Sequence, residues 1–209
     1  EVPLEEARAL ATAAALSGGS LMLSEEVDEL PPERLAILQA LLQPLASAPS
    51  YVELLSPLPR VAVTELQGTY LVAIFAWGGD PWKLSVDLAA LLGLAPEDEE
   101  WHLFEFWSQA YARQSLRTMA AFEASGSGRG CRLLALSRLS GPQVVGSSFH
   151  LACGSELALE ERPRSDGRSA DLLLRAGCAV AEPRLWLFLP GAEAEPRLSG
   201  GRASKAGRH

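Results

Sequence analysis

Hydrophobic positions near the start of the chain recur at the spacing of an α-helix. In residues 4–16 they fall on one face, at Leu4, Ala7, Leu10, Ala11, Ala14 and Ala15, which predicts an amphipathic helix. Gly18 and Gly19 are expected to end it. Residues 20–24 are a short apolar run that predicts a buried strand. Pro31 and Pro32 then open a second predicted helix, which ends near Pro44 and turns inward Leu35, Leu38, Leu41 and Leu42.

From residue 68 onward the pattern changes to short apolar or alternating runs separated by turns rich in Gly, Pro and Ser. The predicted strands cover residues 69–77, 82–88, 101–107, 115–122, 131–138, 142–152, 155–161, 170–175 and 184–189. Strands at this spacing indicate an antiparallel β-sandwich. The sequence thus predicts an α+β chain divided into a helix–strand–helix unit at 1–46, a proline-rich linker at 47–67, the β-sandwich at 68–139, additional strands at 140–192 and a flexible tail at 193–209.

Charge and composition argue against a nucleic-acid partner, a membrane span and a signal peptide. The 209 residues carry a net charge of −8, which argues against a nucleic-acid partner because such a partner needs a clustered basic face. No run of about 18 apolar residues is present, so no membrane span is expected. Glu1, Glu5 and Glu6 stand where a secretory signal would carry positive charge, and no signal peptide is expected.

The cysteines and histidines do not form a metal-binding pattern. Cys131, Cys153 and Cys178 are an odd number at wide spacing, which favours buried free thiols and a reducing, cytoplasmic location over a disulfide framework. His102 and His150 are isolated from acids and cysteines in the sequence, which favours structural roles over metal ligation. We predict no metal site and no cofactor.

Four segments together resemble one family of enzymes. The stretch "EARALATAAALSGGSLMLSEEVDELPPERLAILQALLQP" resembles the end of the catalytic barrel of α-galactosidase-type glycoside hydrolases (family 36 and its melibiase relatives). The stretches "GTYLVAIFAWGGDPWKLSVDLAALLGL" and "EWHLFEFWSQAYA" resemble the C-terminal β-sandwich of the same enzymes. "GCRLLAL" and "PQVVGSSFHLACGSELALEE" resemble its closing strands, so the resemblance covers roughly residues 4–161.

The resemblance implies that residues 1–46 are the last β/α unit of a (β/α)8 barrel, with residues 20–24 as the eighth strand. The family hydrolyses α-galactosides with retention, using two carboxylates about 5–5.5 Å apart. In the family these come from the fourth and sixth barrel strands, which this chain does not contain. We therefore assign no catalytic residue, and we expect the chain alone to be inactive.

Ser24 and Glu25 are the weak candidates for substrate binding, because they follow a predicted barrel strand on the face where barrel active sites form. Glu25 and Glu26 are adjacent on an extended segment and point to opposite sides, so both cannot line one pocket. We favour a role in fixing the loop; pocket lining and a solvated pair are the alternatives. The family usually has Asp where Glu25 stands and often Ser where Pro31 stands, so this chain departs from its relatives there.

An aromatic set in the predicted sandwich has two interpretations. It comprises Trp77, Trp82, Trp101, Phe104, Phe106 and Trp107. Their alternating positions favour the core and the seam between sandwich and barrel. Stacking on sugars is the alternative.

Two hypotheses about function follow. In the first, the chain is the non-catalytic C-terminal portion of an α-galactosidase-like hydrolase, whose sandwich buttresses the upstream barrel portion and shapes contacts in a homo-oligomer. In the second, it is a stand-alone carbohydrate-binding or structural β-sandwich that keeps a relic of the barrel. In both, an α-galactoside or another carbohydrate is the expected partner, without nucleic acid or membrane.

Overall fold

The computed structural model describes residues 2–19, 22, 26–42, 44–45, 48–53, 55–95, 99–119, 122–163, 170–175 and 184–190. The helices are α1 (Leu4–Ser17), α2 (Pro32–Ala40), α3 (Leu88–Leu91) and α4 (Leu116–Met119), with a 3-10 turn at Val27–Glu29. The strands are β1 (Ser50–Tyr51), β2 (Val61–Leu66), β3 (Thr69–Ala76), β4 (Trp82–Val86), β5 (Glu100–Glu105), β6 (Ala110–Ser115), β7 (Phe122–Gly126), β8 (Gly130–Arg138), β9 (Gln143–Ser147), β10 (Ala158–Pro163), β11 (Ala170–Arg175) and β12 (Leu185–Phe188).

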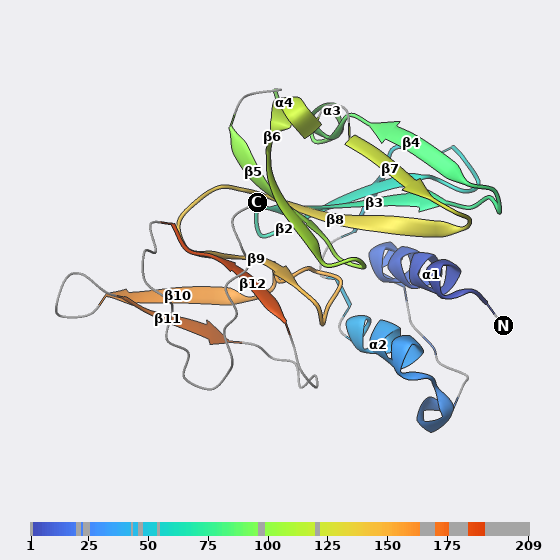
Figure 1. Cartoon of the computed structure of the whole chain (residues 1–209), viewed down its shortest axis with the longest axis horizontal. Coiled ribbons are helices and arrows are strands. Elements are labelled where there is room, and N and C mark those ends of the chain that lie inside the picture. Colours follow the sequence, from blue (N-terminus) through green and yellow to red (C-terminus); the bar gives the residue numbers. More distant parts are fainter. Residues whose placement is uncertain are drawn as a thin grey trace.

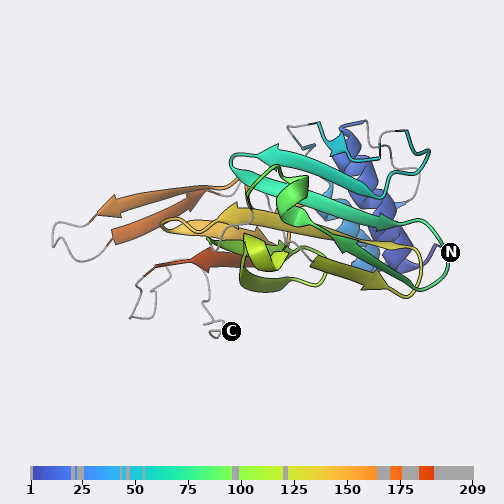
Figure 2. The ribbon, with the colours of Figure 1, turned by 90° about the horizontal axis from the view of Figure 1, so that it is seen from above.

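An antiparallel sheet of six strands forms the centre of this α+β structure (Figure 1). Its order is β1-β2-β3-β8-β5-β6, and three separate two-stranded ladders join β4 to β7, β9 to β12 and β10 to β11. The longest ladder pairs β3 with β8, from Thr69 opposite Ser137 to Ala76 opposite Gly130. The β10–β11 hairpin projects from the end of the body opposite α1 (Figure 2).

Both faces of the central sheet are buried, because successive side chains of a strand point to opposite faces. On β3, Val72 and Ile74 enter a cluster beneath β4, β7 and the short helices α3 and α4. Leu71, Ala73 and Phe75 enter a second cluster, which α1 and β12 help to cover. The near-continuous apolar run of β3 follows from this burial on two sides.

Helix α1 confirms the predicted first helix but turns a different face inward. Gly18 adopts φ 66° and its N–H donates to the Ala15 carbonyl, which ends the helix as expected. Ala9, Thr12 and Leu16 are buried and lie on one face at helical spacing. The prediction for Leu10 was wrong: 51% of this residue is exposed, because the face that packs on β8 lies beside it.

Helix α2 begins with Pro32 at its first turn, as predicted, and ends at Ala40. Ile37 and Ala40 are its buried residues. The prediction that Leu42 faces inward was wrong, since the helix has already ended and 66% of this residue is exposed. Of the predicted strand at residues 20–24, the structure describes Met22 alone, which belongs to no strand and is 92% exposed.

Two further corrections concern segments that lack a clean period of two. Residues 47–67, expected to be a linker, contain β1 and β2, and β2 pairs with β3 along its whole length. The predicted strand at residues 115–122 was also wrong: Ser115 ends β6, Leu116–Met119 form α4, and Phe122 begins β7. The Ser115 hydroxyl accepts a hydrogen bond from the Thr118 N–H at 3.3 Å, which favours a helical turn over a strand there.

Strand β12 brings two aromatic side chains onto the central sheet. The ring of Trp186 packs on that of Phe104, with centroids 4.8 Å apart, and the ring of Phe188 packs on that of His102 at 4.7 Å. Strand β9, which pairs with β12, passes so close to Phe104 that only a glycine fits at position 146. Strands β9 and β12 are therefore tied to the central sheet by side-chain packing. None of the described helices is long and apolar enough to cross a membrane.

Candidate functional site

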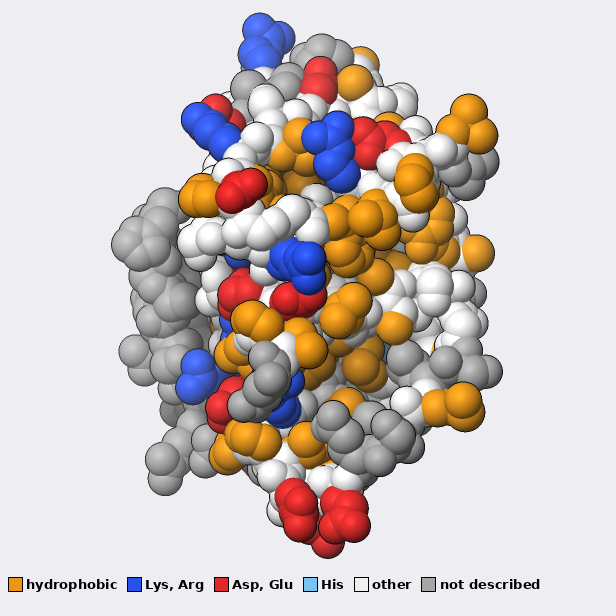
Figure 3. Space-filling model, turned by 90° about the vertical axis from the view of Figure 1, so that its right-hand side faces the viewer, with side chains coloured by type: hydrophobic (Ala, Val, Ile, Leu, Met, Phe, Trp, Pro, Cys, Tyr) orange, Lys and Arg blue, Asp and Glu red, His pale blue; other side chains and the backbone are white. Residues whose placement is uncertain are grey.

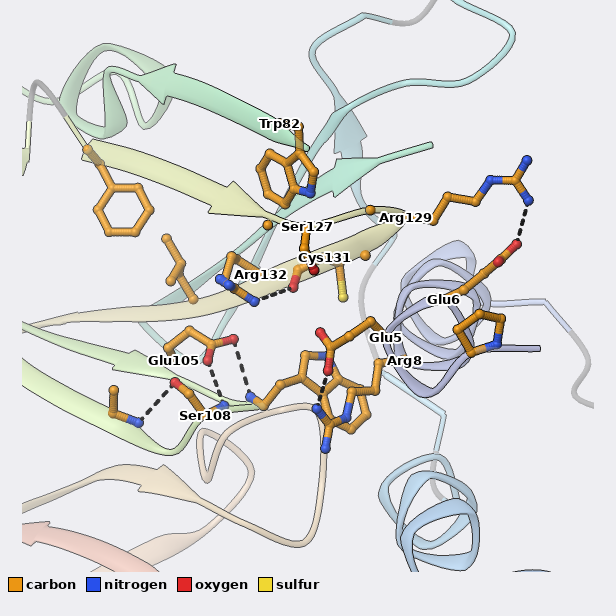
Figure 4. A pocket seen from close by; sticks show the side chains of 18 of the residues that line it. Glu5, Glu6, Arg8, Trp82, Glu105, Ser108, Ser127, Arg129, Cys131 and Arg132 are labelled. Atoms are coloured by element: carbon orange, nitrogen blue, oxygen red, sulfur yellow. Dashed lines mark hydrogen bonds and ion pairs between the residues drawn. The ribbon is translucent and has the colours of Figure 1, made fainter. Parts of the chain in front are cut away.

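An open groove of about 1030 Å³ lies between the first turns of α1, the β5–β6 hairpin and the β7–β8 hairpin (Figure 4). We call it the α1 groove. The residues that decide its chemistry are Glu5, Glu6, Arg8, Trp82, Glu105, Trp107, Arg129 and Arg132. Segments far apart in the sequence meet here because β8 runs beneath α1 and pairs with β5.

Two ion pairs fix charged side chains at the edge of the groove. Arg8 Nη1 lies 2.5 Å from Glu5 Oε1, and Arg129 Nη1 lies 2.8 Å from Glu6 Oε1. The second pair joins α1 to the β7–β8 hairpin. Such exposed pairs contribute only about 0–1 kcal/mol each, so their main effect is to orient the side chains around the groove (Figure 4).

Glu105 is the buried carboxylate of the groove, and it is engaged with the backbone. Its two oxygens accept hydrogen bonds from the N–H groups of Trp107 and Ser108 at 3.3 and 2.6 Å, and Oε1 also accepts from Leu133 N–H at 3.4 Å. These bonds hold the turn between β5 and β6 and tie it to β8. Glu105 therefore acts as a structural acceptor.

A polar chain beneath the groove joins α1 to the sheet. Trp107 Nε1 donates to Thr12 Oγ1 at 3.1 Å, and Thr12 Oγ1 donates to the Arg8 carbonyl at 2.8 Å. Cys131 Sγ lies 3.5 Å from Thr12 Oγ1. Burial is the main cause that raises the pKa of Cys131 to about 12. The thiol therefore stays protonated at neutral pH and is a poor nucleophile.

Trp82 forms the wall of the groove opposite Arg8 (Figure 4). Its indole lies against Gly126, where an added Cβ would stand 2.6 Å from Trp82 Nε1. Trp82 Nε1 is buried and has no hydrogen-bond partner among the described residues, and the same holds for Arg8 Nε. Both N–H donors are thus packed within the walls of the groove without an acceptor among the described residues, which is unusual in folded proteins.

His102 and His150 lie in the core. His102 Nδ1 is 2.8 Å from the Tyr111 hydroxyl, and His150 Nδ1 accepts the Ala152 N–H at 3.1 Å. Burial, with the nearby charge of Arg113 as a smaller cause, lowers the pKa of His102 from 6.5 to about 4. Within the part of the chain that the structure describes, no three His, Cys, Asp or Glu side chains gather closely enough to hold a metal ion.

The lowered pKa of His102 predicts a loss of stability in acid. Between pH 6.5 and 4 the unfolded chain binds a proton that the folded chain does not. The contribution of His102 is therefore fully present above pH 6.5. It falls by up to about 1.4 kcal/mol per pH unit as the pH drops toward 4. Urea unfolding at pH 7 and pH 5 measures it, with His102→Gln as the comparison. Equal losses in the two proteins would contradict the assignment.

Comparisons with known proteins show which solved structures this fold resembles. No model of a known protein family matches the sequence, and no curated protein matches it. A candidate α-N-acetylgalactosaminidase of Bacillus halodurans superposes with a TM-score of 0.53 and 16% identity, over 66% of this chain and 33% of that one. A candidate α-galactosidase or melibiase of Bacteroides fragilis superposes with a TM-score of 0.50 and 11% identity, over 64% of this chain and 28% of that one.

In fold, the chain is similar to part of an α-galactosidase-type glycoside hydrolase. It matches about one third of the length of each of these two relatives. The structural likeness agrees with the resemblance seen in the sequence. At 16% and 11% identity, the similarity shows a shared fold and does not show a shared activity.

The structure describes the aromatic residues singled out in the sequence but not Ser24 and Glu25. Ser24 and Glu25 lie outside the described residues, so their proposed substrate contacts remain predictions. Among the aromatic set, Trp101, Phe104 and Phe106 are buried in the core, as the favoured interpretation held. Trp77, Trp82 and Trp107 are half-buried, and the last two line the α1 groove.

Sequence reasoning did not find the charged residues of the α1 groove. Glu5, Arg8 and Arg132 belong to no sequence motif and are far apart in the chain. Only the pairing of β8 with β5 and the packing of α1 on β8 bring them together. The aromatic set was the one sequence signal that pointed toward this place.

Proposed function

We propose that this chain is the C-terminal, non-catalytic portion of an α-galactosidase-like retaining glycoside hydrolase that acts on α-galactosides. Residues 1–46 would complete its catalytic barrel. The central sheet with β4 and β7 would be the β-sandwich that buttresses this barrel. The fold likeness to part of two such enzymes supports the proposal, since the chain corresponds to about a third of each.

The distribution of exposed hydrophobic side chains is the observation that carries the proposal. Of the nine large ones among the described residues, eight lie within residues 2–58: Val2, Leu10, Met22, Val27, Leu42, Val52, Leu55 and Leu58. Figure 3 views the side of the molecule on which α1 and α2 lie, and hydrophobic side chains gather in its middle. Hydrophobic side chains that gather on one face of a protein mark a contact surface. We assign it to the preceding part of the barrel.

The second hypothesis, a stand-alone carbohydrate-binding or structural β-sandwich, has one observation in its favour. Helix α1 buries Ala9, Thr12 and Leu16, packs on β8 and joins the central core. The helix therefore has a packing partner without any barrel.

A cytoplasmic location also belongs to our proposal, because Cys131 and Cys153 are buried free thiols.

Leu10 distinguishes the two hypotheses. In the 209-residue chain, Leu10→Glu should change the free energy of unfolding by no more than about 0.5 kcal/mol, because the side chain is exposed. In a polypeptide extended at its N-terminus by the rest of the barrel, the same change would bury a charge and cost more than about 2 kcal/mol. Urea unfolding of both pairs measures this.

Leu187→Glu is the matched control, since Leu187 is exposed on β12, outside the helical unit. It should have a small effect in both polypeptides. If Leu10→Glu is equally harmless in the extended polypeptide, the barrel does not cover α1. That result would favour the hypothesis of a stand-alone β-sandwich.

A further inference from the structure

We propose that two copies of this chain pair through the free edge of β6 and form a two-fold symmetric dimer. Strand β6 ends the six-stranded sheet, and among the described strands it pairs with β5 alone. The dimer goes beyond the proposed function, because it uses a different surface from the exposed side chains of residues 2–58 and requires neither a barrel nor hydrolysis. Three properties of β6 support it: an unprotected edge, small side chains on one face and a self-complementary sequence.

The two edges of the central sheet differ in length and protection. Strand β1, at one edge, is only two residues long. Strand β6, at the other, has six residues without proline or lysine, none of them is buried, and its pairing with β5 contains no bulge. Native proteins usually shorten, bend or charge an edge strand, because its unpaired N–H and C=O groups bind other strands. An edge as long and regular as that of β6 is therefore expected to have a partner strand.

The side chains of β6 allow a second sheet to come close. Ala110 and Ala112 lie on the face of the sheet that lines the α1 groove, and both are small. Tyr111 and Arg113 alternate with them and point to the opposite face. The Tyr111 hydroxyl lies 2.8 Å from His102 Nδ1, and this contact holds the ring in position. The edge thus has small side chains on one face and a fixed aromatic ring on the other.

One antiparallel register matches β6 to a second copy of itself. With Ala112 on the two-fold axis, the ladder would pair residues 110–114 of both copies, and Tyr111 would lie opposite Arg113 of the partner subunit. An arginine beside a tyrosine ring gains cation–π attraction, and the two-fold axis repeats the contact. Arg113 is available for it, because its side chain is 43% exposed and its contact with Glu100 is long, at 3.8 Å.

Charge distinguishes this register from its neighbour and from other partners. A register centred on Arg113 would place the two Arg113 side chains directly opposite each other, which is unfavourable. Arg113 is also the charged residue that would repel a basic strand from another protein. In the register centred on Ala112 both copies of Arg113 face an aromatic ring instead. The second copy is therefore the occupant that this edge fits best.

Analytical ultracentrifugation of the 209-residue chain tests the dimer, over roughly 1–200 µM because a small interface is expected to dissociate in the micromolar range. The chain should show a monomer–dimer equilibrium. Ala112→Lys places two lysines opposite each other on the axis and should raise the dissociation constant by about tenfold or more. Ala110→Lys is the matched control. It lies on the same face of the same strand but opposite Gln114 of the partner subunit, so its effect should be less than about threefold.

Cross-linking tests the register and does not depend on the lysine variants. Residues directly opposite in an antiparallel ladder have Cα atoms about 4.5–5.5 Å apart, within the range that a disulfide spans. Ala112→Cys should therefore form a disulfide-linked dimer when oxidised glutathione is added. Ala110→Cys should not, because the two copies of residue 110 would be about 13 Å apart along the strands. The unmodified chain, with its three cysteines, is the background control.

Leu10→Glu separates the β6 edge from the exposed hydrophobic side chains of residues 2–58, and it should leave the dimer intact. A chain that stays monomeric throughout the concentration range would overturn the proposal. So would a dimer that persists in Ala112→Lys, a dimer that Leu10→Glu dissociates, or cross-linking through Ala110→Cys as efficient as through Ala112→Cys. None of these outcomes depends on hydrolysis or on a barrel, so the failure of this proposal is distinguishable from that of the proposed function.

Discussion

Replacing Phe104 with alanine is expected to cost about 3–5 kcal/mol of the free energy of unfolding. Phe104 is fully buried in β5 and belongs to the cluster beneath α1. Its ring packs on Trp186 of β12 with centroids 4.8 Å apart, and it lies directly against Gly146 of β9. Truncation would leave a cavity bounded by strands on two sides. The central sheet can therefore relax little to fill it.

Urea unfolding measures the loss for Phe104→Ala, and Phe122→Ala is the matched control. Phe122 is the same residue type at the start of β7 but is only half-buried. Its truncation should therefore cost clearly less. A Phe104→Ala protein no less stable than Phe122→Ala would show that β9 and β12 do not pack on β5 as described.

Replacing Gly146 with alanine adds a single methyl group and is expected to lower the free energy of unfolding. A Cβ at this position would lie 2.5 Å from Cδ2 and 2.6 Å from Cγ of Phe104, well inside van der Waals contact. Phe104 cannot swing away, because it is fully buried. Overpacking of this kind typically costs about 1–3 kcal/mol. Gly141→Ala is the control, since nothing lies within 4 Å of its added Cβ.

The double variant Gly146→Ala, Phe104→Ala makes the steric argument specific. Removing the ring gives the new methyl group space, so the cost of the double variant should be smaller than the sum of the two single costs. The free energies of unfolding of the four proteins in this cycle measure the coupling. Additive costs would mean that Gly146 is needed for another reason, such as its backbone conformation.

Much of the fold is predictable from local pattern, because the corresponding signals are strong within single segments. The apolar run of β3 and the spacing of α1 with Gly18 at its end predicted these elements nearly to the residue. The strand prediction failed where a strand ends and a helix begins within one short segment. Ser115 ends β6 and also accepts the N–H that starts α4, so the run 115–122 showed no clean period.

The faces of elements were harder to predict than the elements. Leu10 belongs to the apolar face of α1 by its spacing, but β8 receives Ala9, Thr12 and Leu16. The choice depends on the partner, which no local pattern specifies. The α1 groove is the extreme case, since Arg8, Trp82 and Arg132 meet only through long-range packing. Sequence alone suggested the aromatic residues and could not supply the charged ones.

Hydrolysis of p-nitrophenyl α-galactoside tests the central claim most directly. The purified 209-residue chain is assayed beside a polypeptide extended at its N-terminus by the rest of the barrel. Our account predicts activity in the longer polypeptide alone, because the two catalytic carboxylates of a retaining enzyme would lie on the earlier barrel strands. Activity in the 209-residue chain would contradict the non-catalytic assignment and turn attention back to Glu25, Glu26 and the acids of the α1 groove. An inactive longer polypeptide would contradict the assignment to an α-galactosidase-like hydrolase.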